Sequence, residues 1–217
     1  MKIKSIEKLQ ELIDADIAWR KKELIEMRTL IHVSNNPTLN RAGLALLCAH
    51  FEGFIKRISN YYVVFVSFQR VPHDQLKHNF IALQMKEKLH RCSLSEKTSV
   101  HTQFVDCFVT VSNSTFFVKH TENHPIISTE ANPSSEVFEE IVTSLGLSFA
   151  LFETKRNYID TDLLSNRHKV VHGEKVTIET EDFDETFTNI TWIMETYREL
   201  VMDAAIKKQY LKSVNIT

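Results

Sequence analysis

The chain has 217 residues, of which 43% are apolar, and its formal net charge at pH 7 is −2. A chain of this length can bury a core of its own, and we expect a single domain over residues 1–217. The near-neutral charge excludes a protein whose whole surface attracts nucleic acid, so any such contact must come from a local patch or an oligomeric groove. With 4 glycines and 4 prolines, the chain lacks the frequent turns of a barrel or sandwich, and we expect an all-α fold.

The cysteines and the apolar runs indicate a cytoplasmic protein. Cys48, Cys92 and Cys107 lie far apart and form no C-x-x-C pair, which is typical of reduced thiols rather than of a disulfide framework. The first sixteen residues are charged and contain no apolar signal-peptide core. The most apolar run, residues 61–68, is too short to span a bilayer. We therefore expect neither a targeting segment nor a membrane segment.

Three long helices are predicted in the first half of the chain. Apolar residues recur at steps of three, four and seven along residues 3–33, which is typical of an amphipathic helix. Asn36 can cap a second helix, over about 38–65, and Pro37 suits its first position. Residues 61–68 are apolar nearly all round, which predicts either deep burial or a strand. A third helix is expected over about 79–91.

Residues 93–133 are the least regular part and form the expected insert within the bundle. The apolar residues of 104–111 fit a helix or a strand, and 116–118 look extended. The run 132–135 then opens a helix that reaches about Leu145 and ends at Gly146.

Two further helices are predicted near the C-terminus. Asp160 or Thr161 can cap a short helix through Val171, with Gly173 as its stop. Residues 176–180 alternate as in a short strand or an extended turn. Asp182 then caps the last long helix, over about 183–211.

The segment 166–174 concentrates two histidines, an arginine and a lysine in nine residues. On a helical wheel of about 100° per residue, Arg167 falls within an apolar arc. That arc contains Leu163, Leu164, Val170 and Val171. A guanidinium among aliphatic side chains is costly unless it is paired. Arg167 therefore faces an acidic partner, a subunit interface or an anionic ligand, or it is a structural arginine that extends its head to solvent.

His172 lies roughly 140° around the wheel from Arg167. The two side chains share a pocket only if Arg167 bends, if Gly173 ends the helix early or if a second subunit closes the site. A helix C-terminus favours imidazolium, which suits a proton donor near neutral pH. His172 is thus the candidate for proton transfer.

Other catalytic and metal-binding patterns are poorly supported. His168 and His172 have a zinc-binding spacing, but Lys169 stands where a metalloprotease needs its glutamate, and no further ligand set is evident. The chain also lacks a nucleophile elbow and a phosphate-binding loop of the G-x-x-x-x-G-K type. We expect no metal and no cofactor.

Glu52 lies at the edge of the apolar face of the second helix. It either orients Arg167 or His172 or is an ordinary solvent-edge carboxylate. His50, Lys56 and Arg57 are predicted to lie on the surface, with Lys56 the best placed of them to contact phosphate.

Three segments resemble the HEPN superfamily. Arg167-x-x-x-x-His172 is similar to its R-x4–6-H motif, and residues 163–174 resemble its L-x-x-R-N-x-I-A-H-G stretch. Residues 46–56 resemble the A-x-x-E-x-x-x-K helix of the MAE-type, RiboL-PSP-HEPN-like branch, and residues 132–147 resemble the Asn…L-G-L segment of that branch. The family's usual asparagine after the motif arginine is replaced by His168.

This resemblance implies a bundle of helices, a homodimer that brings two motifs together, and RNA cleavage without metal. Attack by the RNA 2′-hydroxyl leaves a 2′,3′-cyclic phosphate. Arg167 and His172 would be catalytic, with His168, Glu52 and Lys169 in support. Family members often act in toxin–antitoxin or antiviral systems, which implies an RNA substrate and a possible antitoxin or other defence protein as partner. Some members have lost catalysis, so the alternative is a module that binds a partner protein or nucleotide.

Overall fold

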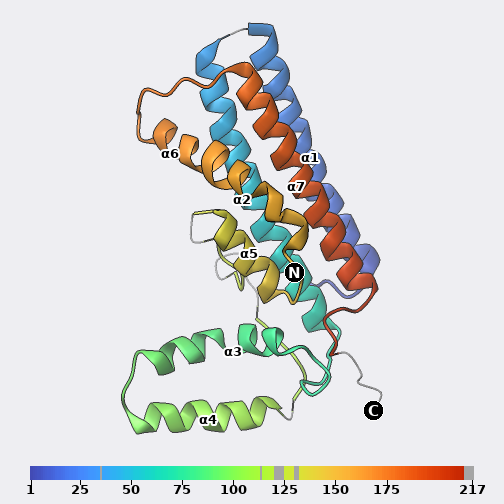
Figure 1. The fold of residues 1–217 in the computed structure, drawn as a ribbon. Coiled ribbons are helices and arrows are strands. Elements are labelled where there is room, and N and C mark those ends of the chain that lie inside the picture. Colours follow the sequence, from blue (N-terminus) through green and yellow to red (C-terminus); the bar gives the residue numbers. More distant parts are fainter. Residues whose placement is uncertain (35, 113, 120–124, 130–131, 213–217) are drawn as a thin grey trace.

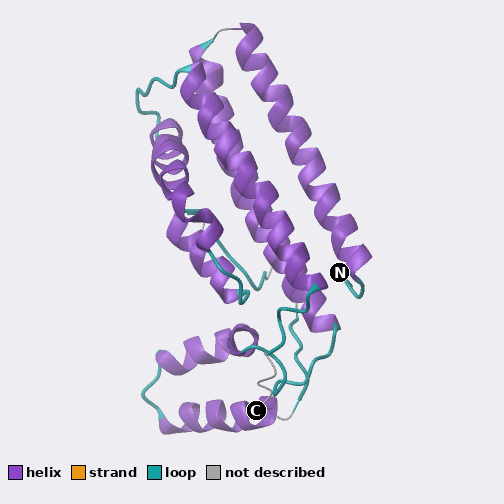
Figure 2. Cartoon of the chain, turned by 45° about the vertical axis from the view of Figure 1, so that its right-hand side comes forward, coloured by secondary structure: helices purple, strands orange, loops and turns teal. Residues whose placement is uncertain are grey.

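The computed structural model describes residues 1–212 except 35, 113, 120–124 and 130–131. The fold is all-α, as predicted. Within the described residues no strand forms, and the only β-type pairings are isolated bridges between Pro72 and Thr115 and between Leu76 and Leu211. Helices and loops account for the described part of the chain (Figure 2).

Three long helices form the body of the molecule. α1 (Ile6–Ser34), α2 (Pro37–Phe68) and α7 (Thr180–Ile206) lie side by side along its long axis (Figure 1). α2 packs against both others, and most of its residues are buried. The α1–α2 connection follows the sequence prediction. Asn36 Oδ1 accepts a 3.0 Å hydrogen bond from the Thr38 amide, and Pro37 occupies the first turn.

The apolar run at the end of α2 stays helical. Residues 62–67 are all buried, because α3 (His78–Ser93) and the chain around Tyr210 cover them. The Tyr62 and Phe80 rings lie 6.1 Å apart, and those of Phe65 and Tyr210 lie 6.3 Å apart. The run is therefore core helix rather than strand.

The predicted irregular insert contains a helix. α4 (Thr98–Ser112) pairs with α3 in a hairpin that projects from one end of the bundle (Figure 1). Val100, Phe104 and Cys107 recur at steps of four and three and are partly buried. A stripe with that spacing suits a helix packed against one neighbour, which resolves the ambiguity between helix and strand.

α5 (Ser135–Ser144) begins and ends where the sequence predicts. Ser134 Oγ accepts a 3.2 Å hydrogen bond from the Val137 amide. Gly146 follows the helix with a φ of +72°, the left-handed conformation that commonly ends helices.

The predicted cap at Asp160 or Thr161 is wrong. A 3-10 helix, η1 (Ala150–Lys155), is followed by a π-helix, η2 (Tyr158–Ser165), which continues directly into α6 (Asn166–Val171). The chain is thus already helical at Asp160. That carboxylate instead accepts hydrogen bonds from the backbone N (2.7 Å) and Oγ (2.5 Å) of Ser135 at the start of α5.

The predicted start and end of the last helix also need correction. α7 begins at Thr180, two residues before Asp182, and ends at Ile206 rather than near Leu211. Asp182 lies in the first turn, where a negative charge is favourable. Beyond Ile206, Lys208 adopts a φ of +51°, and Gln209 N donates to Ala204 O, which closes the helix. No described helix is both long and apolar enough to cross a membrane.

Candidate functional site

The motif segment lies in η2 and α6, which pack along α2 (Figure 1). α6 ends in a tight backbone arrangement. Glu174 N donates to Lys169 O at 2.9 Å, Gly173 N donates to Val170 O at 3.2 Å, and Gly173 has a φ of +73°. This is a Schellman stop, as the sequence predicts. It fixes the backbone of His172, the last residue before the glycine.

α2 also anchors the connection between α6 and α7. Arg41 Nη2 donates a 3.0 Å hydrogen bond to Glu174 O. One residue earlier, the buried Asn40 side chain donates through Nδ2 to Ile178 O at 2.7 Å. The loop that follows His172 is therefore held at two points by the start of α2.

Arg167 is half-buried, and its charge acts on the α2 residue Cys48. Burial raises the pKa of the Cys48 thiol to about 11, with Arg167 lowering it and Glu52 raising it. The three side chains thus share one electrostatic neighbourhood. Within the described part of the chain, Arg167 makes no hydrogen bond or ion pair, so its donors remain available. A thiol with a raised pKa is protonated at neutral pH and is a poor nucleophile.

Glu52 is half-buried and oriented by a residue that the sequence did not single out. Its Oε1 accepts a 2.6 Å hydrogen bond from Oγ1 of Thr129, which is buried. Asn60 holds the segment before Thr129, because its Oδ1 accepts from the amides of Ile126 and Ile127. The end of the insert therefore packs beside α2 near the motif. Glu52 is thus a half-buried carboxylate with a fixed hydrogen-bond donor.

His168 and His172 form a separate pair on the exposed side of α6. Their rings are nearly parallel, with an interplanar angle of 6° and centroids 6.3 Å apart. Both side chains are exposed, as is Lys169. The described residues show no contact between Arg167 and His172, which agrees with their angular separation on the helix. The structure thus places both Arg167 and Glu52 within electrostatic reach of Cys48, and it places the His168 ring beside that of His172.

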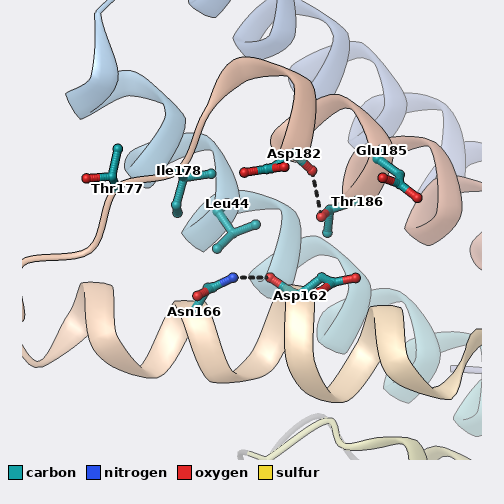
Figure 3. Close-up of a pocket in the computed structure, with 8 residues that line it drawn as sticks. All are labelled: Leu44, Asp162, Asn166, Thr177, Ile178, Asp182, Glu185 and Thr186. Carbon is teal, nitrogen blue, oxygen red and sulfur yellow. Dashed lines mark hydrogen bonds between the residues drawn. The ribbon is translucent and has the colours of Figure 1, made fainter.

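An acidic cavity of about 260 Å³ lies on another side of the motif helix (Figure 3). Its lining includes Asp162 and Asn166 from η2 and α6, together with Asp182 and Glu185 from α7. Burial raises the pKa of Asp162, and the charges of Glu185 and Asp182 raise it further. This side of the helix repels anions. In the described ranges, no group of three or more His, Cys, Asp or Glu side chains is placed to hold a metal ion.

The prediction that His50 lies on the surface is wrong. His50 is 4% exposed and belongs to a charged cluster between α1 and α2. Its Nε2 lies 2.7 Å from Glu23 Oε2, and Arg20 donates to its backbone oxygen at 3.2 Å. Asp16, also buried, pairs with Arg20 at 2.7 Å and with the half-exposed Arg57 at 3.0 Å. No local pattern in the sequence indicates this cluster, because the paired residues of α1 and α2 lie 27 to 41 positions apart.

Comparison with protein families supplies the decisive observation. A family model described as RiboL-PSP-HEPN matches residues 15–203. The chain belongs to the RiboL-PSP-HEPN family. HEPN domains are generally associated with ribonuclease activity. Comparisons with curated proteins and with solved structures find no match. In this HEPN domain, Arg167 lies on α6 and His172 is the C-cap of that helix, both within the matched range.

Proposed function

We propose that this HEPN domain is a metal-independent endoribonuclease. The observation that carries the proposal is the side-chain set of α6 and its C-cap. It comprises a half-buried Arg167 and two exposed imidazoles, His168 and His172, and the described residues show no hydrogen-bond or ion-pair partner for any of the three. Such groups can bind a phosphodiester and transfer protons.

RNA brings its own nucleophile, the 2′-hydroxyl. The protein need only remove one proton, supply another to the leaving oxygen and stabilise the crowded phosphate. His172 transfers a proton, a contribution of roughly 10²–10⁴-fold. Arg167 holds two phosphate oxygens with its planar fork. Glu52, fixed by Thr129, orients the guanidinium from the α2 side. The products are a 2′,3′-cyclic phosphate and a 5′-hydroxyl.

Local charge determines which side of α6 faces RNA. Lys169 and Lys175 are exposed near the two histidines and have no ion-pair partner in the described structure. The acidic cavity with Asp162, Asp182 and Glu185 occupies a different side. A near-neutral protein can therefore bind RNA through a local patch. Lys169 contributes to binding rather than to chemistry.

We further propose that the protein works as a homodimer with α6 at the interface. It would act as a toxin or antiviral effector, with an antitoxin or another defence protein as its partner. Val171, on α6, is 52% exposed despite being apolar, which suits a contact surface.

The test is incubation of the purified protein with total RNA in EDTA, beside His172→Ala. We expect cleavage products that end in a 2′,3′-cyclic phosphate from the wild type and none from the variant. His172 is exposed, so its truncation opens no core cavity and leaves the fold intact. An exposed histidine on α3, His90, provides the matched control as His90→Ala. RNA that is bound but never cut would instead favour the non-catalytic binding module.

A further inference from the structure

Two proton transfers are needed for this reaction, and the proposed function so far names one histidine for them. A base must take the proton of the 2′-hydroxyl, and an acid must protonate the departing 5′-oxygen. These two oxygens lie on opposite sides of one phosphorus atom. The two catalytic groups must therefore stand apart by the width of a phosphate, each within about 3 Å of its oxygen.

The His168–His172 pair has this geometry within one subunit. Their rings are nearly parallel at a centroid separation of 6.3 Å, which is room for a phosphate to contact both. The positions are four residues apart, so they lie about 40° from each other on the helix. The stop at Gly173 fixes the backbone of this last turn. Both rings are exposed to a substrate from the same side.

The position of Arg167 supports the same assignment. On the helical wheel His168 lies about 100° from Arg167, whereas His172 lies about 140° away. His168 is therefore the imidazole with the smaller angular separation from Arg167 around the helix axis. His50 and Arg57 of α2 pair with α1, which leaves Arg41, Glu52 and Lys56 as the other charged residues of that helix. Among the described residues none of these pairs with either imidazole, so both are free to exchange protons.

We propose that His168 is a second catalytic residue and that His168 and His172 of one subunit form the general acid–base pair. One neutral imidazole takes the 2′-hydroxyl proton as the O2′–P bond forms. The P–O5′ bond breaks as the other imidazole, initially protonated, gives its proton to the 5′-oxygen. The number of protons on the protein is unchanged, and no co-reactant is needed. This inference rests on the proposed ribonuclease function, and it differs from a site in which two subunits each supply one histidine.

The experiment compares His168→Asn and His172→Asn with the wild type on two substrates. One is an ordinary RNA oligonucleotide, and the other carries sulfur in place of the 5′-bridging oxygen at a single cleavage position. A departing thiolate needs no proton, so that substrate removes the need for the acid. On ordinary RNA we expect each variant to lose roughly 10²–10⁴-fold in rate. On the sulfur substrate, the variant that lacks the general acid should recover its cleavage rate, whereas the variant that lacks the general base should not.

If the two histidines had a merely structural role, both variants would cleave both substrates at equally reduced rates. That result would overturn the proposal. His168→Asn also introduces the family's usual residue, so a variant that cuts RNA at the wild-type rate would equally overturn it. His90→Asn is the matched control, and melting temperatures of all variants verify the fold. A wild-type protein that does not cut RNA would instead refute the proposed function itself, which separates the two failures.

Mixed dimers test whether the pair belongs to one subunit. Wild-type subunits are co-purified with subunits that carry both His168→Asn and His172→Asn. We expect about half of the activity of the wild-type dimer, because one complete pair remains. Loss of nearly all activity would show that both subunits contribute to each site and would overturn the single-subunit pair. A protein that cuts RNA as a monomer would support it directly.

Discussion

Nη1 of Arg20 on α1 lies 3.3 Å from Nδ1 of His50 on α2. A guanidinium can only donate, so Nδ1 accepts and the ring proton resides on Nε2, which faces Glu23. His50 is therefore held neutral between a cation and a carboxylate. The cluster joins α1 to α2 through a histidine whose charge changes near physiological pH.

Acidification is expected to weaken the fold through His50. Burial lowers the pKa of His50, and Arg20 lowers it further, against the opposing effect of Glu23. The unfolded chain takes up a proton near pH 6.5, whereas the folded protein takes it up only at lower pH. Stability is thus fully present above about pH 6.5 and falls as the pH drops below it. Thermal unfolding at pH 7 and pH 5 measures this loss.

The control is His50→Gln, which keeps a donor and an acceptor but does not titrate. Its melting temperature should depend less on pH over the same range than that of the wild type. The Asp16, Glu23 and Arg57 side chains are unchanged in this variant, so the difference isolates the histidine. An equal pH dependence in both proteins would show that His50 is not responsible.

Gly53 is expected to tolerate no side chain. A Cβ there would lie 2.9 Å from Nη1 and 3.1 Å from Nη2 of Arg20. Arg20 is 4% exposed and is held by Asp16 and His50, so it cannot move away freely. An alanine in a helix normally stabilises by roughly 0.5–1 kcal/mol over glycine. Here we expect Gly53→Ala to destabilise by about 1–3 kcal/mol, measured by chemical denaturation.

Removing the guanidinium should remove that penalty. In an Arg20→Met background, Gly53→Ala is expected to be neutral or stabilising. A Gly53→Ala protein as stable as the wild type would contradict the close packing of Arg20 on the α2 backbone.

Asp162→Asn is expected to stabilise the protein at neutral pH. The raised pKa of Asp162 means that its charged form is penalised by burial and by Glu185 and Asp182. The penalty is present at pH 7, where the group is ionised, and disappears below the pKa of the unfolded chain, near 4. We expect the melting temperature at pH 7 to rise by about 1–2 °C, the shift that roughly 0.5 kcal/mol produces.

The gain should vanish at acidic pH, where Asp162 is neutral in both states. Glu181→Gln removes an exposed carboxylate from the same start of α7, outside the cavity lining, and should produce no rise. A destabilised Asp162→Asn protein would indicate that the carboxylate has a favourable partner at this site.

The dimer is expected to depend on α6. Val171→Glu places a charge on an exposed apolar side chain of that helix and should weaken dimerisation at least about tenfold, which corresponds to 1.4 kcal/mol. Ile206→Glu is the control. Ile206 is 55% exposed and is the last residue of α7, a helix of 27 residues that is roughly 40 Å long. Because α7 begins shortly after α6 in the chain, Ile206 lies at the end of α7 that is far from α6. Sedimentation measures the dimer affinity of both variants. A wild-type protein that stays monomeric at micromolar concentration, even with RNA present, would refute the dimer.

Local signals in the sequence predicted the helix boundaries that depend on local hydrogen bonds. Asn36 and Ser134 cap the helices that follow them, and Gly146 and Gly173 end the helices before them. The failed cap at Asp160 has a physical reason, because its carboxylate bonds to Ser135, twenty-five residues away. The π-helical turn before α6 was not predictable from apolar spacing, because residues 158–165 depart from the usual 3.6 residues per turn.

The candidate site was predictable only where its residues lie close in the sequence. Arg167, His168 and His172 lie within six positions of each other. The contact of Thr129 with Glu52 joins residues 77 positions apart, so no local pattern indicates it. For the same reason the sequence left open whether Glu52 lies near Arg167. Long-range packing, rather than helix propensity, determines these neighbours.

Arg167→Lys is expected not to be conservative. Lysine keeps the charge but loses the planar pair of donors that holds two phosphate oxygens. We expect RNA cleavage to fall at least tenfold while the melting temperature moves by no more than about 1–2 °C. Cleavage rate, melting temperature and dimer affinity are measured on this one variant. Arg91→Lys is the control, since Arg91 is exposed on α3 and has no described partner.

The three measurements separate three roles of Arg167. A solvated arginine would leave cleavage unchanged and alter stability by less than about 0.5 kcal/mol. A clamp on phosphate lowers cleavage alone. An anchor for Glu52 lowers stability and dimer affinity together, because lysine keeps the charge but loses the planar donors that would hold a half-buried carboxylate. Glu52→Gln distinguishes the last two roles. If Arg167 anchors Glu52, this variant should lose stability and dimer affinity as Arg167→Lys does. If Arg167 is a phosphate clamp, the variant should keep part of its RNA cleavage. A variant that matches the wild type in all three measurements would refute the catalytic and the structural assignment of Arg167 together.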